Sequence, residues 1–221
     1  MIFKQRNLGG STGKVYQYLF DEIIYNRLKP GAALSEAEIA LTLKISRTPV
    51  REALMILESE GIINRYPSRG CFVAMITVKD VEEIFELRRV LEVQALRNAI
   101  MRIQDEELSA LERKLEALTP ESSQSEYFET DRELHSLLYK CCGNNRLVDF
   151  LGILNAQIER VRVISAGKPS RLSQSRLEHI GLVRSLSARN LEETEKLLVE
   201  HISNVRDSTL EVCKYMTISY V

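Results

Sequence analysis

The sequence predicts a mainly α-helical protein in two parts, a small domain that ends in a β-hairpin and an all-helical bundle. Apolar residues recur at three- and four-residue steps from Lys14 almost to the end of the chain, which is the spacing of amphipathic helices. Two short β-type runs, at 62–66 and 71–76, interrupt that pattern. Glycine and proline are sparse, at 10 and 5 of 221 residues, which disfavours a fold built from many turns.

The first 76 residues predict three helices followed by the hairpin. Residues 1–12 are expected to be flexible, and the first helix runs from there to a stop at Pro30-Gly31. Ser35, with a glutamate three residues later, has the pattern of a capping box that opens the second helix. A third helix is expected from a cap at Ser46 to Gly61, and the segment PSRG (67–70) joins the two strands.

Beyond residue 76 the sequence predicts a bundle of long amphipathic helices. The expected helices are 78–101, 104–118, 124–142, 145–165, 170–187 and 190–214. Polar breaks such as GNN (143–145) and SARN (187–190) separate them. We therefore expect two domains, 1–76 and 77–221.

Composition places the chain among ordinary globular proteins, with 44% hydrophobic and 28% charged residues. The first residues lack the apolar segment of a signal peptide, and no apolar run approaches the ~20 residues of a membrane span. The four cysteines form no C-x-x-C pair, and a reducing cytoplasm is the expected location. Residues 1–75 hold 10 Lys/Arg and 7 Asp/Glu of the chain's 30 and 31, so a basic first part could meet a polyanion.

The arrangement of helices and hairpin at the N-terminus predicts a winged helix-turn-helix, whose third helix enters the DNA major groove with its N-terminus leading. Arg47 and Arg51 lie one turn apart there, and a guanidinium can bind guanine O6 and N7 together or clamp a phosphate. Thr48 offers a hydroxyl to phosphate, and Arg69 next to Gly70 at the hairpin tip could reach the adjacent backbone. Two solvated arginines on an amphipathic helix are the ordinary alternative, which the surrounding motif disfavours.

The stretch LKPGAALSEAEIALTLKISRTPVREALMILESEGIINRYPSRGCFVA resembles the N-terminal domain of GntR-type bacterial transcription regulators. The resemblance rests on PG followed by L-S-E, on SRTPVREAL, on LESEGII and on the wing PSRGCFV. It implies that Arg47, Thr48 and Arg51 contact double-stranded operator DNA, together with Arg69 and Gly70 of the wing. A basic residue early on the second helix can also touch DNA in this family. Ala37 stands at that position here, so this contact is not expected.

The three histidines of the chain all lie beyond residue 130. His179 and His201 are equidistant from residue 190, so in an antiparallel helix hairpin they stand at one level, ~16 Å from the turn. Asp131 and His135 share a helix face at a similar depth before the GNN break. Three imidazoles and one carboxylate at one level of a bundle suit Zn²⁺, Ni²⁺, Mn²⁺ or Fe²⁺. Each histidine could instead be an ordinary core or surface residue.

From about residue 78 the chain resembles the FCD domain, the all-helical effector-binding domain of FadR-like GntR regulators. The matching segments are ELRRVLE (86–92), DRELH (131–135), GNNRL (143–147), LEHIGLVRSL (177–186) and EHI (200–202). In metal-binding members an Asp and a His one turn apart join two later histidines, and this sequence supplies Asp131, His135, His179 and His201. Leu134 departs from the pattern, since an aromatic residue often precedes the first histidine.

Two further residues are candidates for an effector pocket. The resemblance implies that Arg88 faces the cavity and could pair with a ligand's carboxylate. A surface ion pair with Glu92 is the alternative, and Arg89 competes for the same role. Asn204, three residues after His201 on the same helix face, is expected to line the pocket.

The leading functional hypothesis is a ligand-responsive transcriptional regulator. A homodimer would place two winged helices on palindromic DNA, and a small organic acid at the metal centre would most often release a repressor. The first alternative is a metal-dependent enzyme that uses the three-His, one-Asp centre, although no clear general base stands beside the ligands. The second alternative is a regulator in which the metal is purely structural.

Overall fold

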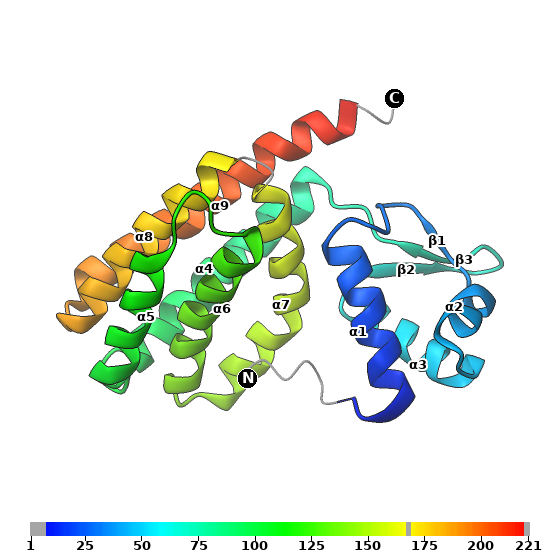
Figure 1. The fold of residues 1–221 in the computed structure, drawn as a ribbon, viewed down its shortest axis with the longest axis horizontal. Helices are drawn as coiled ribbons and strands as arrows, with labels where there is room; N and C mark the ends of the chain where they lie inside the picture. The colour runs from blue at the N-terminus through cyan, green and yellow to red at the C-terminus, as the bar shows by residue number, and fades with distance from the viewer. Residues whose placement is uncertain (1–7, 167–168, 219–221) are drawn as a thin grey trace. The chain divides into compact units, whose positions relative to one another are not determined.

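The computed structural model describes residues 8–166 and 169–218, which form two compact units. Of the described residues, the first unit takes in 8–77, together with Ile153–Val163. The second contains Val78–Gly152, 164–166 and 169–218. Helices dominate and one small sheet is present (Figure 1), which confirms the predicted fold class. Within the described ranges, no helix combines the length and the apolar character needed to cross a membrane.

The first unit has the three expected helices and a small antiparallel sheet. The elements are α1 (Gly10–Ile24), β1 (Ala33–Leu34), α2 (Glu36–Leu43), α3 (Arg47–Ser59), β2 (Ile63–Tyr66) and β3 (Gly70–Val73). β3 lies between β1 and β2, so the predicted hairpin gains a third strand. With two residues, β1 is too short to give an alternating sequence pattern. The fully buried Val15, Val50 and Leu54 join α1 and α3 in one core.

Helix α1 differs from the expectation at both ends. Residues 10–12, which we expected to be flexible, are helical, because the Thr12 hydroxyl bonds Glu52 Oε2 at 2.6 Å and the next turn is buried. Residues 1–7 lie outside the described residues. The helix ends at Ile24, ahead of the predicted Pro30 stop. Asn26 adopts a left-handed φ of 58°, and the Leu28 amide donates to Glu22 O at 2.8 Å, so this turn satisfies the helix end.

Two turns of the first unit place the predicted DNA-contacting segments. Ser35 Oγ accepts the Glu38 amide at 3.3 Å at the start of α2, as the capping pattern predicted. Lys44 then adopts a left-handed φ of 55° and turns the chain from α2 into α3. At the hairpin tip Gly70 has a φ of 95°, a conformation in which only glycine is unstrained, so Arg69 projects from a tight turn.

All six helices predicted beyond residue 76 are present. They are α4 (Val78–Ala99), α5 (Asp105–Ala117), α6 (Gln124–Cys141), α7 (Asn145–Ser165), α8 (Pro169–Ser187) and α9 (Leu191–Ile218). Most ends agree within two or three residues, because long amphipathic stripes and polar breaks determine them. The middle of α7, Ile153–Val163, belongs to the first unit and not to the bundle, which differs from the expected domain 77–221.

Four of these helices close a ring around the candidate site. α4 packs against α6 and α9, and α8 packs against the same two helices, while α5 covers α6 and α8 (Figure 1). The α8–α9 turn is fixed to the end of α4 by Arg189, whose guanidinium donates to Ile100 O at 2.6 Å and to Ile103 O at 2.7 Å. Both carbonyls lie just past the end of α4, so these bonds hold the α8–α9 turn against the connection between α4 and α5.

Candidate metal centre and nucleic-acid interface

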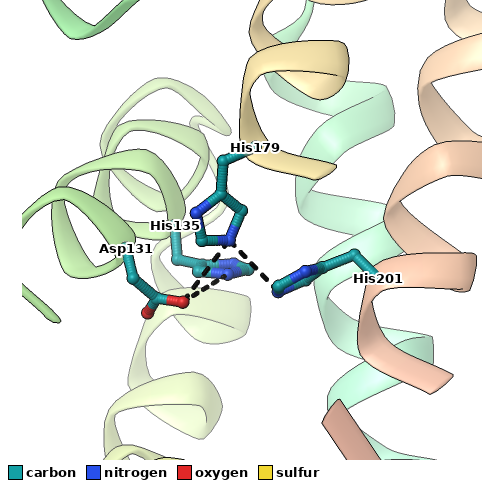
Figure 2. A group of neighbouring side chains, drawn as sticks. All are labelled: Asp131, His135, His179 and His201. Atoms are coloured by element: carbon teal, nitrogen blue, oxygen red, sulfur yellow. Dashed lines mark hydrogen bonds and ion pairs between the residues drawn. The ribbon is translucent and has the colours of Figure 1, made fainter. Parts of the chain in front are cut away.

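The structure brings together the four residues that the sequence predicted as metal ligands. Asp131 and His135 come from α6, His179 from α8 and His201 from α9, and all four are buried. One ligand atom from each lies within 4.8 Å of every other. Figure 2 shows the carboxylate and the three rings converging on one point between the helices.

The separations between these atoms fit a common metal ion. His179 Nε2 lies 3.3 Å from His201 Nε2 and 3.4 Å from Asp131 Oδ1. His135 Nε2 lies 3.9 Å from the same Asp131 oxygen. Tetrahedral ligands bound at about 2.0–2.1 Å are separated by roughly 3.4 Å, so only small shifts are needed. Buried imidazole and carboxylate donors suit a divalent transition metal.

On one side of the cluster, α4 contributes a buried ion pair. Arg88 Nε donates to Glu92 Oε1 at 2.8 Å, and its Nη2 lies 3.0 Å from His135 Nε2. Glu92 Oε2 lies 2.8 Å from His135 Nδ1, and Tyr139 donates its hydroxyl to Glu92 Oε1 at 2.6 Å. Burial acts to raise the pKa of the Glu92 carboxyl, but the Arg88 guanidinium and the contacts with His135 and Tyr139 hold that pKa well below its usual value.

On the other side, Glu178 contacts the outer face of His201. Its Oε2 lies 2.7 Å from His201 Nδ1, and Asn204 Nδ2 donates to its Oε1 at 2.9 Å. Arg171 donates to both oxygens, with 2.9 Å to Oε1. Burial acts to raise the pKa of Glu178, but the bonds from His201 and Arg171 lower it to about 2. The carboxylate is therefore ionised at any ordinary pH.

The imidazoles of His179 and His201 are held in their neutral, metal-binding form. Burial is the largest cause, and it lowers the pKa of His179 well below its usual value, with a further contribution from neighbouring His201. Burial likewise lowers the pKa of His201 to about 4, against the opposing effect of Glu178. Metal binding requires neutral imidazoles, so both rings have a lone pair available at pH 7.

The two candidates for effector contacts lie at different depths. Arg88 is 1% exposed and touches the cluster, whereas Arg89 is exposed, so of the two arginines only Arg88 reaches His135. The pair of Arg88 with Glu92 exists, but inside the bundle and not on its surface. Asn204 meets the cluster only indirectly, through Glu178. Glu178 and Arg171 were not among the residues predicted from the sequence, although Glu178 directly precedes His179.

Replacing Arg88 by alanine is expected to destabilise the protein by about 3–5 kcal/mol, because the Glu92 charge would stay buried without its partner. Urea unfolding of metal-free protein would measure the change. Arg89→Ala is the matched control, since that neighbouring side chain is exposed, and it is expected to change the free energy of unfolding by less than about 0.5 kcal/mol. Equal changes in the free energy of unfolding for the two substitutions would contradict a buried ion pair between Arg88 and Glu92.

The predicted DNA-contacting residues all lie at the surface of the first unit. Arg47, Thr48 and Arg51 are exposed on the first turns of α3, and Arg69 and Gly70 are exposed at the hairpin tip. Arg51 Nε also forms an ion pair with Glu36 Oε2 at 2.6 Å. Arg47 and Arg51 are therefore exposed, as the predicted contacts with DNA require.

Comparison with known proteins links both units to bacterial gene regulation. Residues 11–73 match the family of bacterial regulatory proteins called the gntR family, and residues 83–204 match the FCD domain. The chain is 27% identical over 202 residues to the HTH-type transcriptional repressor RspR of Escherichia coli (strain K12), covering 90% of this chain and 89% of that protein.

Solved structures show the same fold. The structure of E. coli McbR/YncC gives a TM-score of 0.75 at 24% identity and covers 89% of this chain and 95% of its own. The Zn²⁺-bound FCD domain of TM0439 gives a TM-score of 0.56 at 24% identity, covering 62% of this chain and 96% of that domain.

Proposed function

The chain belongs to the gntR family of bacterial transcriptional regulators and carries an FCD domain, and from this premise we propose that it is a repressor released by a small organic acid bound at a metal centre. The observation that carries the proposal is the convergence of Asp131, His135, His179 and His201 inside the bundle. A regulator of this kind works beside the chromosome, in the cytoplasm.

Asp131 and the three histidines would hold the metal, which is proposed as Zn²⁺, Ni²⁺, Mn²⁺ or Fe²⁺. Zn²⁺ is the first to test, because the similar FCD domain of TM0439 has been solved with this ion. The bound ion supplies a Lewis-acidic centre. Four protein donors fill a tetrahedral site but leave two positions free on a six-coordinate ion, so the coordination number distinguishes a sensing metal from a structural one.

The charges around the cluster favour an anionic effector. Asp131, Glu92 and Glu178 are carboxylates, whereas Arg88 and Arg171 are guanidiniums, which gives −1 with neutral imidazoles. A divalent ion changes that sum to +1. In a buried site an uncompensated positive charge attracts a carboxylate, and Arg88 is close enough to the cluster to pair with it.

We further propose a homodimer, so that two recognition helices meet the two halves of a palindromic operator. The outward face of α4 exposes Leu87 by 50% and Val90 by 60%, one turn apart. Leu87→Glu with Val90→Glu is expected to convert the dimer to a monomer in light scattering and to weaken operator binding. Leu191→Glu, at an exposed apolar residue of α9, is the control and should remain dimeric. A double variant that stays dimeric would exclude this face.

The electrostatics of the site favour a regulator over a metal-dependent enzyme. A general base that works near pH 7 needs a pKa close to that pH. Glu92 and Glu178, which flank the ligands, have lowered pKa values and are paired with arginines. Product formation at a catalytic rate from any acid incubated with the metal-loaded protein would contradict this interpretation.

The proposal is tested with untagged, Zn²⁺-loaded protein and a panel of citrate, malate, succinate and lactate. A ligand that binds only the native state raises the unfolding temperature, so at least one acid should shift it, and the shift should disappear after chelation. Stabilisation by zinc with no response to any acid would favour the purely structural metal.

A further inference from the structure

His201 is contacted at both of its ring nitrogens. Its Nε2 faces the cluster, 3.3 Å from His179 Nε2, while its Nδ1 lies 2.7 Å from Glu178 Oε2 on the opposite side of the ring. An ionised carboxylate can only accept a hydrogen bond. His201 Nδ1 must therefore carry the hydrogen of this contact, so a metal can be bound only through Nε2, the atom that faces the other ligands.

The Glu178 carboxylate is itself held in place from both helices of the α8–α9 pair. Arg171, two turns earlier on α8, donates to both carboxylate oxygens, and Asn204 on α9 donates to Oε1 at 2.9 Å. A carboxylate with every oxygen in use has little freedom to rotate. The contact from Glu178 to His201 is thus a fixed feature of the α8–α9 pair.

We propose that Glu178 is a positioning residue of the metal centre, which fixes the tautomer and the plane of the His201 ring so that Nε2 becomes the metal ligand. This inference rests on the proposed metal centre. Metal-bound histidines commonly donate their second N–H to a carboxylate, and loss of that carboxylate typically weakens metal binding 10- to 100-fold.

Glu178 offers a cleaner test than Glu92, the carboxylate beside His135. Glu92 is 0% exposed and also pairs with Arg88 and Tyr139, so its removal would disturb the core. The Glu178 side chain is 20% exposed and lines a groove of about 590 Å³ between α8 and α9 with Arg171, Asn204 and Asp207. Water can therefore fill the space left by a shorter side chain at Glu178, without a cavity in the core.

The experiment measures the His201 tautomer directly, by nitrogen-15 NMR of the full-length protein without metal. Wild-type protein is expected to carry the proton on Nδ1. Glu178→Ala should transfer much of that population to Nε2, and the zinc dissociation constant, from competition with a chromophoric chelator, should rise 10- to 100-fold. Glu178→Gln keeps an acceptor oxygen, so it should retain the Nδ1–H and bind zinc more tightly than the alanine variant.

Glu195→Ala is the matched control, because Glu195 is a carboxylate of α9 that pairs with Arg97 away from the cluster. It should change neither the tautomer nor the zinc affinity. If Glu178→Ala does not fold, Glu178→Asp replaces it, since the shorter side chain withdraws the acceptor while keeping the charge beside Arg171. An unchanged tautomer with unchanged zinc affinity in the folded variant would overturn the proposal. Wild-type protein that shows the Nδ1–H but binds no zinc would contradict the metal centre and leave the Glu178–His201 contact standing.

Discussion

Replacing His179 by alanine is expected to remove most of the bound metal while leaving the helical domain folded. His179 Nε2 lies close to two of the other proposed ligand atoms, at 3.3 Å from His201 Nε2 and 3.4 Å from Asp131 Oδ1. Loss of a residue that only hydrogen-bonds to a metal ligand typically lowers metal affinity about 10- to 100-fold. Loss of a direct ligand should therefore lower it by at least about 100-fold. Elemental analysis of protein purified without chelator, together with a zinc titration, measures the change.

Arg184→Ala is the matched control for this substitution. Arg184 lies on the same helix and forms ion pairs with Glu112 and Glu116 on the surface, away from the cluster. It should bind the metal like the wild type. A His179→Ala protein that retains one metal per chain would rule out the four-ligand centre, provided that its circular dichroism shows a folded domain.

Replacing Arg47 or Arg51 by alanine is expected to weaken operator binding by about 10- to 100-fold, equivalent to about 1–3 kcal/mol. Both side chains are exposed on the first turns of α3. Arg51 is paired with Glu36, but an exposed ion pair contributes only about 0–1 kcal/mol. A contact with DNA can therefore replace this ion pair. Loss of the ion pair in the Arg51→Ala variant should hardly change the free energy of unfolding.

Arg27→Ala provides the control, because Arg27 also forms an exposed ion pair, with Glu22, at the end of α1. It removes the same charge from the same unit without touching α3. DNA selected from a random pool by the wild-type protein serves as the operator in an anisotropy titration. If Arg51→Ala and Arg27→Ala bind this DNA equally well, the recognition-helix assignment is wrong.

The helices of the bundle could be predicted closely, because a stripe of apolar residues over five or more turns leaves little ambiguity. Helix α6 begins at Gln124 as expected, since Ser123 and Glu126 form a capping box there. Shorter features depended on tertiary contacts that no local pattern records. The end of α1 at a left-handed Asn26 and the pairing of Ala33–Leu34 with β3 belong to this class.

The cluster could be predicted because a helix hairpin relates residues that are equidistant from its turn. His179 and His201 flank a turn at Arg189, whose φ is 54°, and their Nε2 atoms lie 3.3 Å apart. Glu178, which contacts the outer nitrogen of His201, could not be predicted in the same way. Glu178 and His179 are adjacent and point in directions about 100° apart on a helix, so only the packing of α8 on α9 shows that both contact His201.

The most direct test of a metal-centred switch is the operator affinity of the Zn²⁺-loaded protein, measured with and without the acid from the panel that gives the largest thermal shift. Saturating acid is expected to weaken operator binding by about 5- to 150-fold. The same acid is expected to have no effect on the operator affinity of the His179→Ala variant. Operator affinity that is unchanged by an acid shown to bind the zinc-loaded protein would contradict a metal-centred switch.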